Sequence, residues 1–428
     1  MPKLRVSLPR LILLVLLTMV VTVLGINLFS DPEKKIRREV RHAYGVEDPQ
    51  FSRAMGVLLG PALVEGNRVE TLLNGDEIFP AMLSAIRSAK RTITFETYIY
   101  WSGGIGQEFA DALSERARAG VKVHILVDWV GSQKMDAKLL GQMREAGVEL
   151  RKYHALRWYT LDRLNNRTHR KLLVVDGRVG FTGGVGIADD WSGHAQDKDH
   201  WRDTHYRLEG PAVAQMQAAF MDNWTKVTGR VYSTPDYFPA LAPAGELRAQ
   251  VFKSSIDGGA ESIHLMYLLS VAAATRSIDL SMAYFVPDDV ALDALVAALR
   301  RGVKVRIILP GPISDAKLVQ KASRAKWGAL LAAGGEIWQY QPTMFHCKVL
   351  VVDSLWTSVG STNFDTRSFR LNDESNLNVL DAGFAKRQEE DFARDLAHSR
   401  RVTLAEWAGR PWTEKAWEHV LALFDGQL

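Results

Sequence analysis

Two copies of one short motif hold the side chains of this chain that are best suited to phosphate chemistry. Both copies read His-x-Lys-x4-Asp, and they span residues 169–176 and 346–353. A neutral imidazole can attack phosphorus or transfer a proton near neutral pH, and an ammonium group attracts the non-bridging oxygens of a phosphate. One His-x-Lys is common by chance, but two copies with the same spacing predict a single site that unites both pairs. The candidate catalytic residues are His169, Lys171, Asp176, His346, Lys348 and Asp353.

The apolar residues inside each motif predict a buried strand. Leu172 to Val175 and Val349 to Val352 are short runs rich in β-branched residues, and turn residues follow each run. Side chains alternate between the two faces of a strand, so the His and Lys of one motif point to the same side. The Asp lies an odd number of residues from the His and points elsewhere. We therefore assign the His and Lys to a pocket, and the Asp to holding the end of the strand or its turn.

The segments around the motifs alternate between helical and extended patterns. We predict helices at 76–90, 106–119 and 138–146, and strands at 92–101, 121–128 and 148–153. Similar blocks return in the same order, since Lys90 to Thr94 corresponds to Thr275 to Asp279. A small-residue turn also follows each motif at the same distance, at 183–186 and at 360–363. The pattern predicts a duplicated α/β fold with mainly parallel strands, and the largest insertion lies at 155–168 of the first half.

Composition excludes some classes of site. The chain has 428 residues with 53 basic and 49 acidic side chains, so its charge is nearly balanced and gives no nucleic-acid signature. Its single cysteine, Cys347, excludes an intrachain disulfide and a zinc site built on cysteines. Cys347 lies between the His and Lys of the second motif, so strand alternation turns it away from the pocket.

An apolar run near the N-terminus predicts a membrane anchor. Leu11 to Phe29 contains no charged residue and is long enough, as a helix, to span the hydrocarbon layer. No small-x-small cleavage site follows it, which favours an uncleaved anchor over a signal peptide. Five basic residues follow the run and three precede it. By a small margin this excess predicts a catalytic domain on the cytoplasmic side of the cell membrane.

These observations predict five segments. Residues 1–30 form the anchor and residues 31–64 a basic juxtamembrane segment. Residues 65–231 form the first lobe, and a proline-containing linker at 232–246 leads to the second lobe at 247–428, which ends in a helix after Pro411. The apolar residues of that last helix, Trp412 and Trp417 among them, are expected to pack onto their own lobe.

The sequence resembles the phospholipase D superfamily, and within it the bacterial cardiolipin synthases. The similarity extends from about Leu72 to the C-terminus. It includes the segment Asn165 to Lys171 around the first motif and the upstream blocks Phe95 to Tyr100 and Val127 to Ser132. Further similar blocks are Trp201 to His205, Gly210 to Val213, Asn363 to Ser368 and Asn372 to Asn376. One departure is Gly186, where many relatives have an asparagine that matches Asn363.

The resemblance implies two similar lobes with mixed, mostly parallel sheets flanked by helices, and an active site between them. It also implies a reaction through a phosphohistidine without a metal or other cofactor. His169 is then the nucleophile, and His346 the general acid and base. Asp203 and Glu374 match carboxylates that orient the two imidazoles. The residues that match phosphate-binding positions, beside the two lysines, are Ser361, Asn363, Gly184 and Gly186.

The function that the resemblance favours is phosphatidyl transfer at a membrane, in which two phosphatidylglycerol molecules form cardiolipin and glycerol. One alternative is hydrolysis of phospholipids, or less readily of nucleic acid, because water and an alcohol differ only in how the site excludes water. Another is a non-catalytic membrane scaffold. The expected partners are phospholipids and the membrane, and no nucleic acid is expected. The sequence leaves the oligomeric state and the identity of both lipids open.

Overall fold

The computed structural model describes residues 7–29, 36, 38, 40–154, 165–255 and 262–422. Most of the predicted insertion at 155–168 and part of the basic juxtamembrane segment lie outside these residues. The elements of the first half are α1 (Leu8–Phe29), α2 (Pro49–Leu59), β1 (Val64–Leu73), α3 (Asn74–Ser88), β2 (Thr92–Thr97), α4 (Gly104–Arg118), β3 (Lys122–Asp128), α5 (Ala137–Glu145), β4 (Glu149–Tyr153), β5 (Arg167–Thr168), β6 (Leu172–Val175), β7 (Val179–Gly183), the 3₁₀ helix η2 (Asp189–Trp191), β8 (Thr204–Glu209) and α6 (Val213–Thr228).

The second half repeats much of this order and adds elements at its end. Its elements are β9 (Leu247–Lys253), α8 (Ser262–Ala273), β10 (Ser277–Met282), β11 (Phe285–Val286), α9 (Asp289–Arg300), β12 (Lys304–Pro310), α10 (Lys317–Ala332), β13 (Glu336–Tyr340), β14 (Lys348–Val352), β15 (Trp356–Gly360), β16 (Phe364–Asp365), α11 (Thr366–Arg370), β17 (Asn372–Asp373), β18 (Ser375–Leu380), α12 (Ala382–Ala397), β19 (Ser399–Val402), α13 (Leu404–Ala408) and α14 (Trp412–Ala422). The helices and strands predicted between residues 76 and 153 are confirmed, with ends shifted by a few residues.

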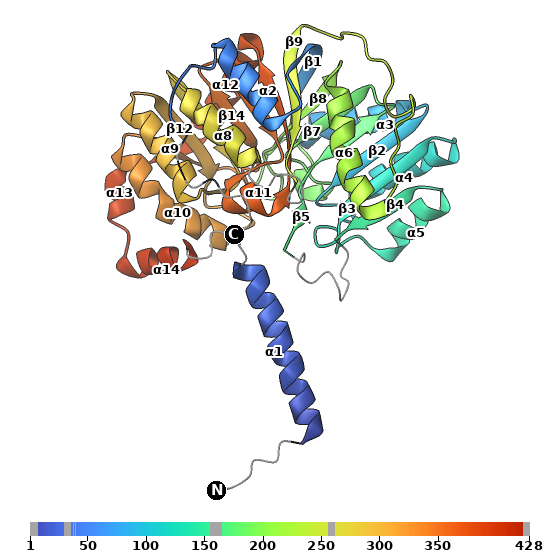
Figure 1. Cartoon of the computed structure of the whole chain (residues 1–428), viewed down its shortest axis with the longest axis horizontal. Helices are drawn as coiled ribbons and strands as arrows, with labels where there is room; N and C mark the ends of the chain where they lie inside the picture. The colour runs from blue at the N-terminus through green and yellow to red at the C-terminus, as the bar shows by residue number, and fades with distance from the viewer. Residues whose placement is uncertain are drawn as a thin grey trace.

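One mixed sheet of fifteen strands runs through both halves, in the order β19-β13-β12-β10-β14-β15-β18-β9-β1-β8-β7-β6-β2-β3-β4. From the centre outward, β1-β8-β7-β6-β2-β3-β4 has the same arrangement as β9-β18-β15-β14-β10-β12-β13, so the duplication is visible in the strand order. The halves meet where β1 pairs with β9, between the two lobes of Figure 1. The resemblance implies sheets in two similar lobes, and the structure joins the strands of both lobes into one continuous sheet.

The prediction of mostly parallel strands is wrong. Within the large sheet, four neighbouring pairs are parallel: β2–β3, β3–β4, β10–β12 and β12–β13. The other ten neighbouring pairs are antiparallel. The reason is local: helices connect the parallel strands, whereas each motif strand is joined to the next strand by a turn of three residues, which can join only antiparallel neighbours.

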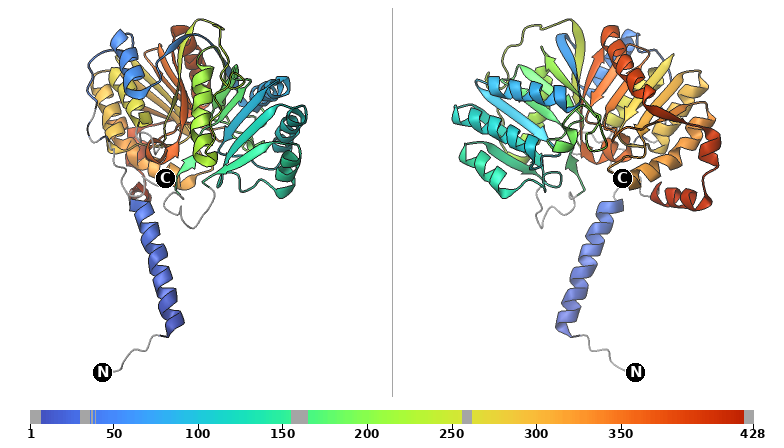
Figure 2. Two further views of the ribbon diagram at one scale, coloured as in Figure 1. Left: turned by 45° about the vertical axis from the view of Figure 1, so that its right-hand side comes forward. Right: turned by 180° about the vertical axis from the view of Figure 1, so that it is seen from behind.

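Helices cover both faces of the sheet and enclose three main apolar clusters. The helices α3, α4 and α5 pack on the first half, and α8, α9 and α10 pack on the second. The third cluster lies under α6 and α12 and draws residues from both halves, among them Leu172, Val174, Val349 and Val351 of the motif strands. Figure 2 shows helices on either side of the strands. Because one core supports both motif strands, the two motifs are held at a constant separation.

The two ends of the chain differ from the body. Helix α1 projects away from the body in all views (Figures 1 and 2), and its large apolar side chains from Leu8 to Val21 are exposed. Helix α14 packs against α10, but Trp412 and Trp417 are 78% and 63% exposed, so the expectation that they pack onto their own lobe is wrong. In the part of the chain that the structure describes, no helix is both long and apolar enough to cross a membrane.

Candidate active site

Both motifs open into one cavity of about 740 Å³ between the halves. His169, Lys171 and His346 line it, together with Asn363 and Gly186 of the two small-residue turns. The two histidines come from the residues just before β6 and β14, and each motif strand lies between two partner strands in the sheet. The predicted strands β6 and β14 are confirmed, and the fold brings the two motifs together as the duplication predicted.

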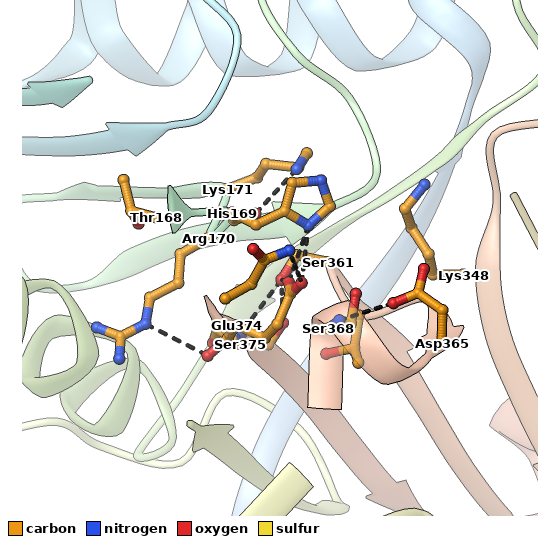
Figure 3. A network of polar contacts seen from close by, with 12 residues as sticks. Thr168, His169, Arg170, Lys171, Lys348, Ser361, Asp365, Ser368, Glu374 and Ser375 are labelled. Carbon is orange, nitrogen blue, oxygen red and sulfur yellow. Dashed lines mark hydrogen bonds and ion pairs between the residues drawn. The ribbon is translucent and has the colours of Figure 1, made fainter. Parts of the chain in front are cut away.

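A carboxylate from the second half holds His169. Its Nδ1 lies 2.9 and 3.0 Å from the two carboxylate oxygens of Glu374, and both side chains are buried. Glu374 also accepts a hydrogen bond from the hydroxyl of Ser361 at 2.5 Å. Figure 3 shows Glu374 behind the imidazole, while Arg170 points away from it. Since Nδ1 is engaged by the carboxylate, Nε2 is left as the ring nitrogen that can react.

A carboxylate from the first half holds His346. Its Nδ1 lies 2.7 Å from Oδ2 of Asp203, which is also buried. The same oxygen accepts a hydrogen bond from Nε1 of Trp191 at 2.9 Å. Each motif histidine is therefore oriented by a carboxylate from the other half of the chain.

Backbone pairing explains this exchange. Arg167 and Thr168 of β5 pair with Asn372 and Asp373 of β17, and the backbone N–H of His169 donates to the carbonyl of Asp373 at 2.9 Å. In the other half, the backbone N–H of His346 donates to the carbonyl of Arg202 at 2.8 Å. In both cases the accepting residue directly precedes the orienting carboxylate. The backbone contact thus places each carboxylate beside the histidine of the opposite motif.

Burial has the largest effect on the pKa of each of the two histidines. It lowers the pKa of His169 to about 4, although Glu374 opposes this effect. Burial and the neighbouring Lys348 lower the pKa of His346, although Asp203 opposes them. Burial alone would raise the pKa of Asp203, but His346 and Lys348 lower it below its usual value. At neutral pH the site therefore holds neutral imidazoles against ionised carboxylates.

The two lysines lie beside their own histidines. Nζ of Lys171 donates to the carbonyl of His169 at 2.9 Å, and Nζ of Lys348 donates to the carbonyl of His346 at 2.6 Å. Burial lowers the pKa of Lys171 to about 7, and it also lowers the pKa of Lys348. A buried ammonium gains much from an anion that enters the cavity, because water screens it little there.

The motif aspartates lie away from the cavity and hold turns. Asp176 accepts hydrogen bonds from the backbone N–H groups of Lys90, Arg91 and Thr92 at 2.7–2.9 Å. Asp353 accepts equivalent bonds from the backbone of residues 275–277 at 2.7–2.8 Å. This placement agrees with the alternation argument. Both aspartates have positive φ, 52° and 53°, a conformation that Asp and Asn tolerate better than most residues.

The predicted phosphate-binding residues divide into two groups. Asn363 and Gly186 line the cavity, and Oδ1 of Asn363 is buried without a hydrogen-bond partner among the described residues. In contrast, the N–H of Gly184 donates to Thr204 at 3.0 Å and the hydroxyl of Ser361 donates to Glu374. Gly186 leaves no space for a side chain, because a Cβ there would lie 2.8 Å from Ile99. This steric restriction explains why position 186 holds glycine in this chain where many relatives have asparagine.

Sequence reasoning missed the aromatic lining. The ring of Tyr98 lies 5.3 Å from that of His169, and the ring of Tyr284 lies 6.3 Å from that of His346. The indoles of Trp191 and Trp201 lie 5.3 and 5.4 Å from His346. The two tyrosines follow the equivalent strands β2 and β10, so comparing the repeats beyond the motifs is the signal that would have found them.

Comparison with known proteins agrees with this geometry. The family described as "Cardiolipin synthase, PLD-like domain" matches residues 82–223 and 268–396. Cardiolipin synthase 2 of Bacillus anthracis is 37% identical over 335 residues, which cover 78% of this chain and 65% of that protein. The major cardiolipin synthase ClsA of Bacillus subtilis is 36% identical over 350 residues, which cover 81% of this chain and 72% of that protein. The matched region thus spans about two thirds of these relatives.

The fold also resembles that of a solved enzyme. The crystal structure of a phosphatidylserine synthase from Haemophilus influenzae superposes with a TM-score of 0.67 at 15% identity, covering 89% of this chain and 100% of that one. This likeness concerns the fold alone. The match to the family model and the identity to the curated relatives carry the assignment: the chain belongs to the phospholipase D superfamily and is a cardiolipin synthase-like member of it.

Proposed function

We propose that this protein is a membrane-bound phosphatidyltransferase of the cardiolipin synthase type, which condenses two phosphatidylglycerol molecules to cardiolipin and glycerol. The observation that carries this proposal is the pair of oriented histidines that face one cavity, which Lys171 also lines. The names and similarity of the relatives support the lipid substrates.

In the first half-reaction, Nε2 of His169 attacks the phosphorus of the donor lipid. A phosphorus–nitrogen bond forms, the bond from phosphorus to the glycerol headgroup breaks, and His346 gives its proton to the departing oxygen. Lys171 and Lys348, with Asn363, stabilise the charge on the non-bridging oxygens. Gly186 lies at the same cavity wall, and Glu374 and Asp203 keep the imidazoles oriented.

In the second half-reaction, His346 removes the proton from the hydroxyl of the acceptor lipid. That oxygen attacks phosphorus, the bond to His169 breaks, and the product leaves. Burial and Lys348 lower the pKa of His346, whereas the carboxylates of Asp203 and Asp315 oppose this shift, and a bound anionic phosphate would oppose it further. The carboxylates and the phosphate thus favour the protonated His346 that the first half-reaction requires.

We also propose that α1 anchors the protein in the cell membrane as a single span, with the catalytic domain on the cytoplasmic side. The uncharged run from Leu11 to Phe29 and the exposure of its large apolar side chains from Leu11 to Val21 support this proposal. The domain boundaries set out from the sequence also stay a proposal. They are compatible with the starts of β1 at Val64 and β9 at Leu247.

Incubation of the purified protein with phosphatidylglycerol in detergent micelles tests the reaction. Cardiolipin and free glycerol in equal amounts are the expected products. Phosphatidic acid as the main product would make the protein a hydrolase, and absence of turnover would make it a scaffold. The His169→Ala variant is the matched control, because its cavity keeps every other group that binds lipid.

A further inference from the structure

Equivalent residues near the cavity differ in charge although the halves repeat. The motif histidines are 177 positions apart, and equivalent residues of the two halves near the site have the same separation. Arg167, two residues before the first histidine, lines the cavity, whereas the equivalent residue of the second half is the buried Met344. Arg367, which follows the second small-residue turn, also lines the cavity, and its equivalent is Asp190. Duplication conserved the reacting groups, but both arginines lack a basic equivalent in the other half.

The two arginines belong to the wall of the cavity. Arg167 is in β5, opposite Asn372 of β17, and Arg367 is in the helix α11. Arg367 donates to the side chain and the backbone carbonyl of Asn165 at 3.1 and 3.0 Å. Burial and the neighbouring charge of Arg167 lower the pKa of Arg367. Both guanidinium groups therefore stand at the wall of one cavity, where an anion that contacts both would be stabilised.

The two arginines lie within electrostatic reach of the residues around His169. Burial and the carboxylates of Asp128 and Asp315 raise the pKa of Tyr98, whose ring stands beside His169, and both arginines oppose this shift. The carboxylates of Asp190, Asp315 and Asp365 also line the cavity. Asp315 accepts a hydrogen bond from the hydroxyl of Tyr284 at 2.6 Å, on the side of His346. A polyol headgroup with its hydroxyl donors suits these carboxylates, and a phosphate suits the two arginines.

The proposed reaction requires places for two phosphates. Both the donor and the acceptor lipid carry a phosphodiester, but only the phosphorus of the donor reacts. The lysines of the motifs serve the reacting phosphate. The second phosphate must enter a cavity that already contains an anionic phosphohistidine, so an additional cationic group is needed to offset the repulsion.

We propose that Arg167 and Arg367 form a second phosphate subsite, which binds the non-reacting phosphodiester of the acceptor phospholipid. This inference rests on the proposed function and deepens it. The planar guanidinium groups bind phosphate oxygens in pairs and orient the acceptor so that its free hydroxyl reaches His346. The subsite selects an anionic phospholipid as the acceptor in preference to a small uncharged alcohol.

The test compares two acceptors that share one donor. Phosphatidylglycerol in detergent micelles is supplied with and without ethanol, and cardiolipin and phosphatidylethanol are quantified. In Arg167→Gln and Arg367→Gln, cardiolipin formation is expected to fall about tenfold to a hundredfold, the range for loss of a hydrogen bond to a charged group. Phosphatidylethanol formation is expected to stay close to that of the wild type. Arg167→Lys and Arg367→Lys keep the charge and should retain part of the cardiolipin synthesis.

Arg118→Gln, an exposed position on α4, is the control for a general loss of positive charge, and it should change neither product. Equal loss of both products in the glutamine variants, with unchanged melting temperature, would assign the arginines to the donor phosphate and overturn the subsite. Unchanged formation of both products would overturn it as well. Wild-type protein that forms phosphatidylethanol but no cardiolipin would refute the proposed function itself, which separates that failure from failure of the subsite.

Discussion

At the scale of residues, the two motif histidines have similar hydrogen bonds but different charged neighbours. Both use Nδ1 to contact a carboxylate, so both present Nε2 to the cavity. They differ in their surroundings, because Asp315 acts on His346, whereas the arginines of the proposed subsite lie within electrostatic reach of the residues around His169. We infer that the neutral nucleophile and the proton carrier are distinguished by these neighbours rather than by the motifs.

The roles of the histidines can be separated with an activated donor. In His346→Ala the leaving alkoxide has no proton donor, so turnover of phosphatidylglycerol should fall by roughly two to four orders of magnitude. A donor with p-nitrophenol as its leaving group needs little protonation, so the first half-reaction should recover. An adduct on His169 should then accumulate, because its breakdown still lacks a base. Mass spectrometry of the trapped protein measures this.

In the same experiment, His169→Ala should be inactive with every donor. Rescue of His169→Ala by the activated donor, with the adduct on His346, would reverse the two roles. If neither variant yields an adduct, a direct in-line displacement replaces the covalent mechanism.

The buried imidazole of His169 should make stability depend on pH. Its pKa is about 4 in the folded protein and about 6.5 in an unfolded chain. The unfolded chain therefore binds the proton more readily, so stability is fully present above pH 6.5 and falls as the pH drops to about 4. The difference corresponds to about 3 kcal/mol.

Urea unfolding of the wild type and of His169→Gln at pH 7 and pH 4.5 checks this prediction. The wild type should lose more stability than the variant over this interval, because glutamine does not titrate. Equal losses in the two proteins would show that His169 does not titrate as its burial requires.

At the scale of elements, each motif strand is followed by a turn of three residues, and the motif aspartate is the first of them. Asp176 and Gly177 both have positive φ, and so do Asp353 and Ser354, as a type I′ turn requires. The carboxylate of each aspartate also accepts backbone N–H groups from the segment that leads into the neighbouring strand, β2 or β10. The aspartate thereby fixes the register of the motif strand relative to its neighbour.

Asp176→Asn and Asp353→Asn should lower stability with little effect on chemistry. Asparagine tolerates positive φ but carries no charge, so the hydrogen bonds from the backbone weaken by about 1–3 kcal/mol. Thermal melting should show a lower melting temperature, while kcat of the folded variants stays near that of the wild type. A variant that melts like the wild type but has no activity would show that the aspartate takes part in the reaction.

At the scale of the whole molecule, one continuous sheet and one shared apolar cluster join the halves. The cluster under α6 and α12 takes residues from both motif strands, and the pairing of β1 with β9 continues the sheet. The exchange of carboxylates requires this rigid junction, because a shift of one half would separate both histidines from their partners at once.

The anchor proposal predicts where the protein is found in cells. Replacing Leu13, Leu17 and Val20 of α1 by Lys should move the protein from the membrane fraction to the soluble fraction, because a lysine in the middle of a membrane helix costs about 2.5–3.5 kcal/mol. The same three positions changed to Ala provide the control, which should remain in the membrane fraction. Membrane retention of the Lys variant would contradict the anchor.

Local patterns in the sequence were sufficient for the parts of the site that depend on local geometry. Strand alternation placed His169 and Lys171 on the side of the cavity and Asp176 away from it, because alternation requires only neighbouring residues. The helices and strands before the first motif were also predictable from their periodicity. Strand direction was not, since short turns such as Asp176-Gly177 reverse the chain and make most pairs antiparallel.

Only the tertiary structure decided which distant residues meet. Glu374 lies 205 positions from His169, and no local pattern indicates that the carboxylate of the second half serves the histidine of the first. The pairing of β5 with β17 creates that contact. The same holds for the charge of the cavity lining, since Arg167 and Arg367 line one cavity only when the two halves pack. Spacing along the chain therefore determined which groups exist and which way they face, and packing between the halves decided which of them act together.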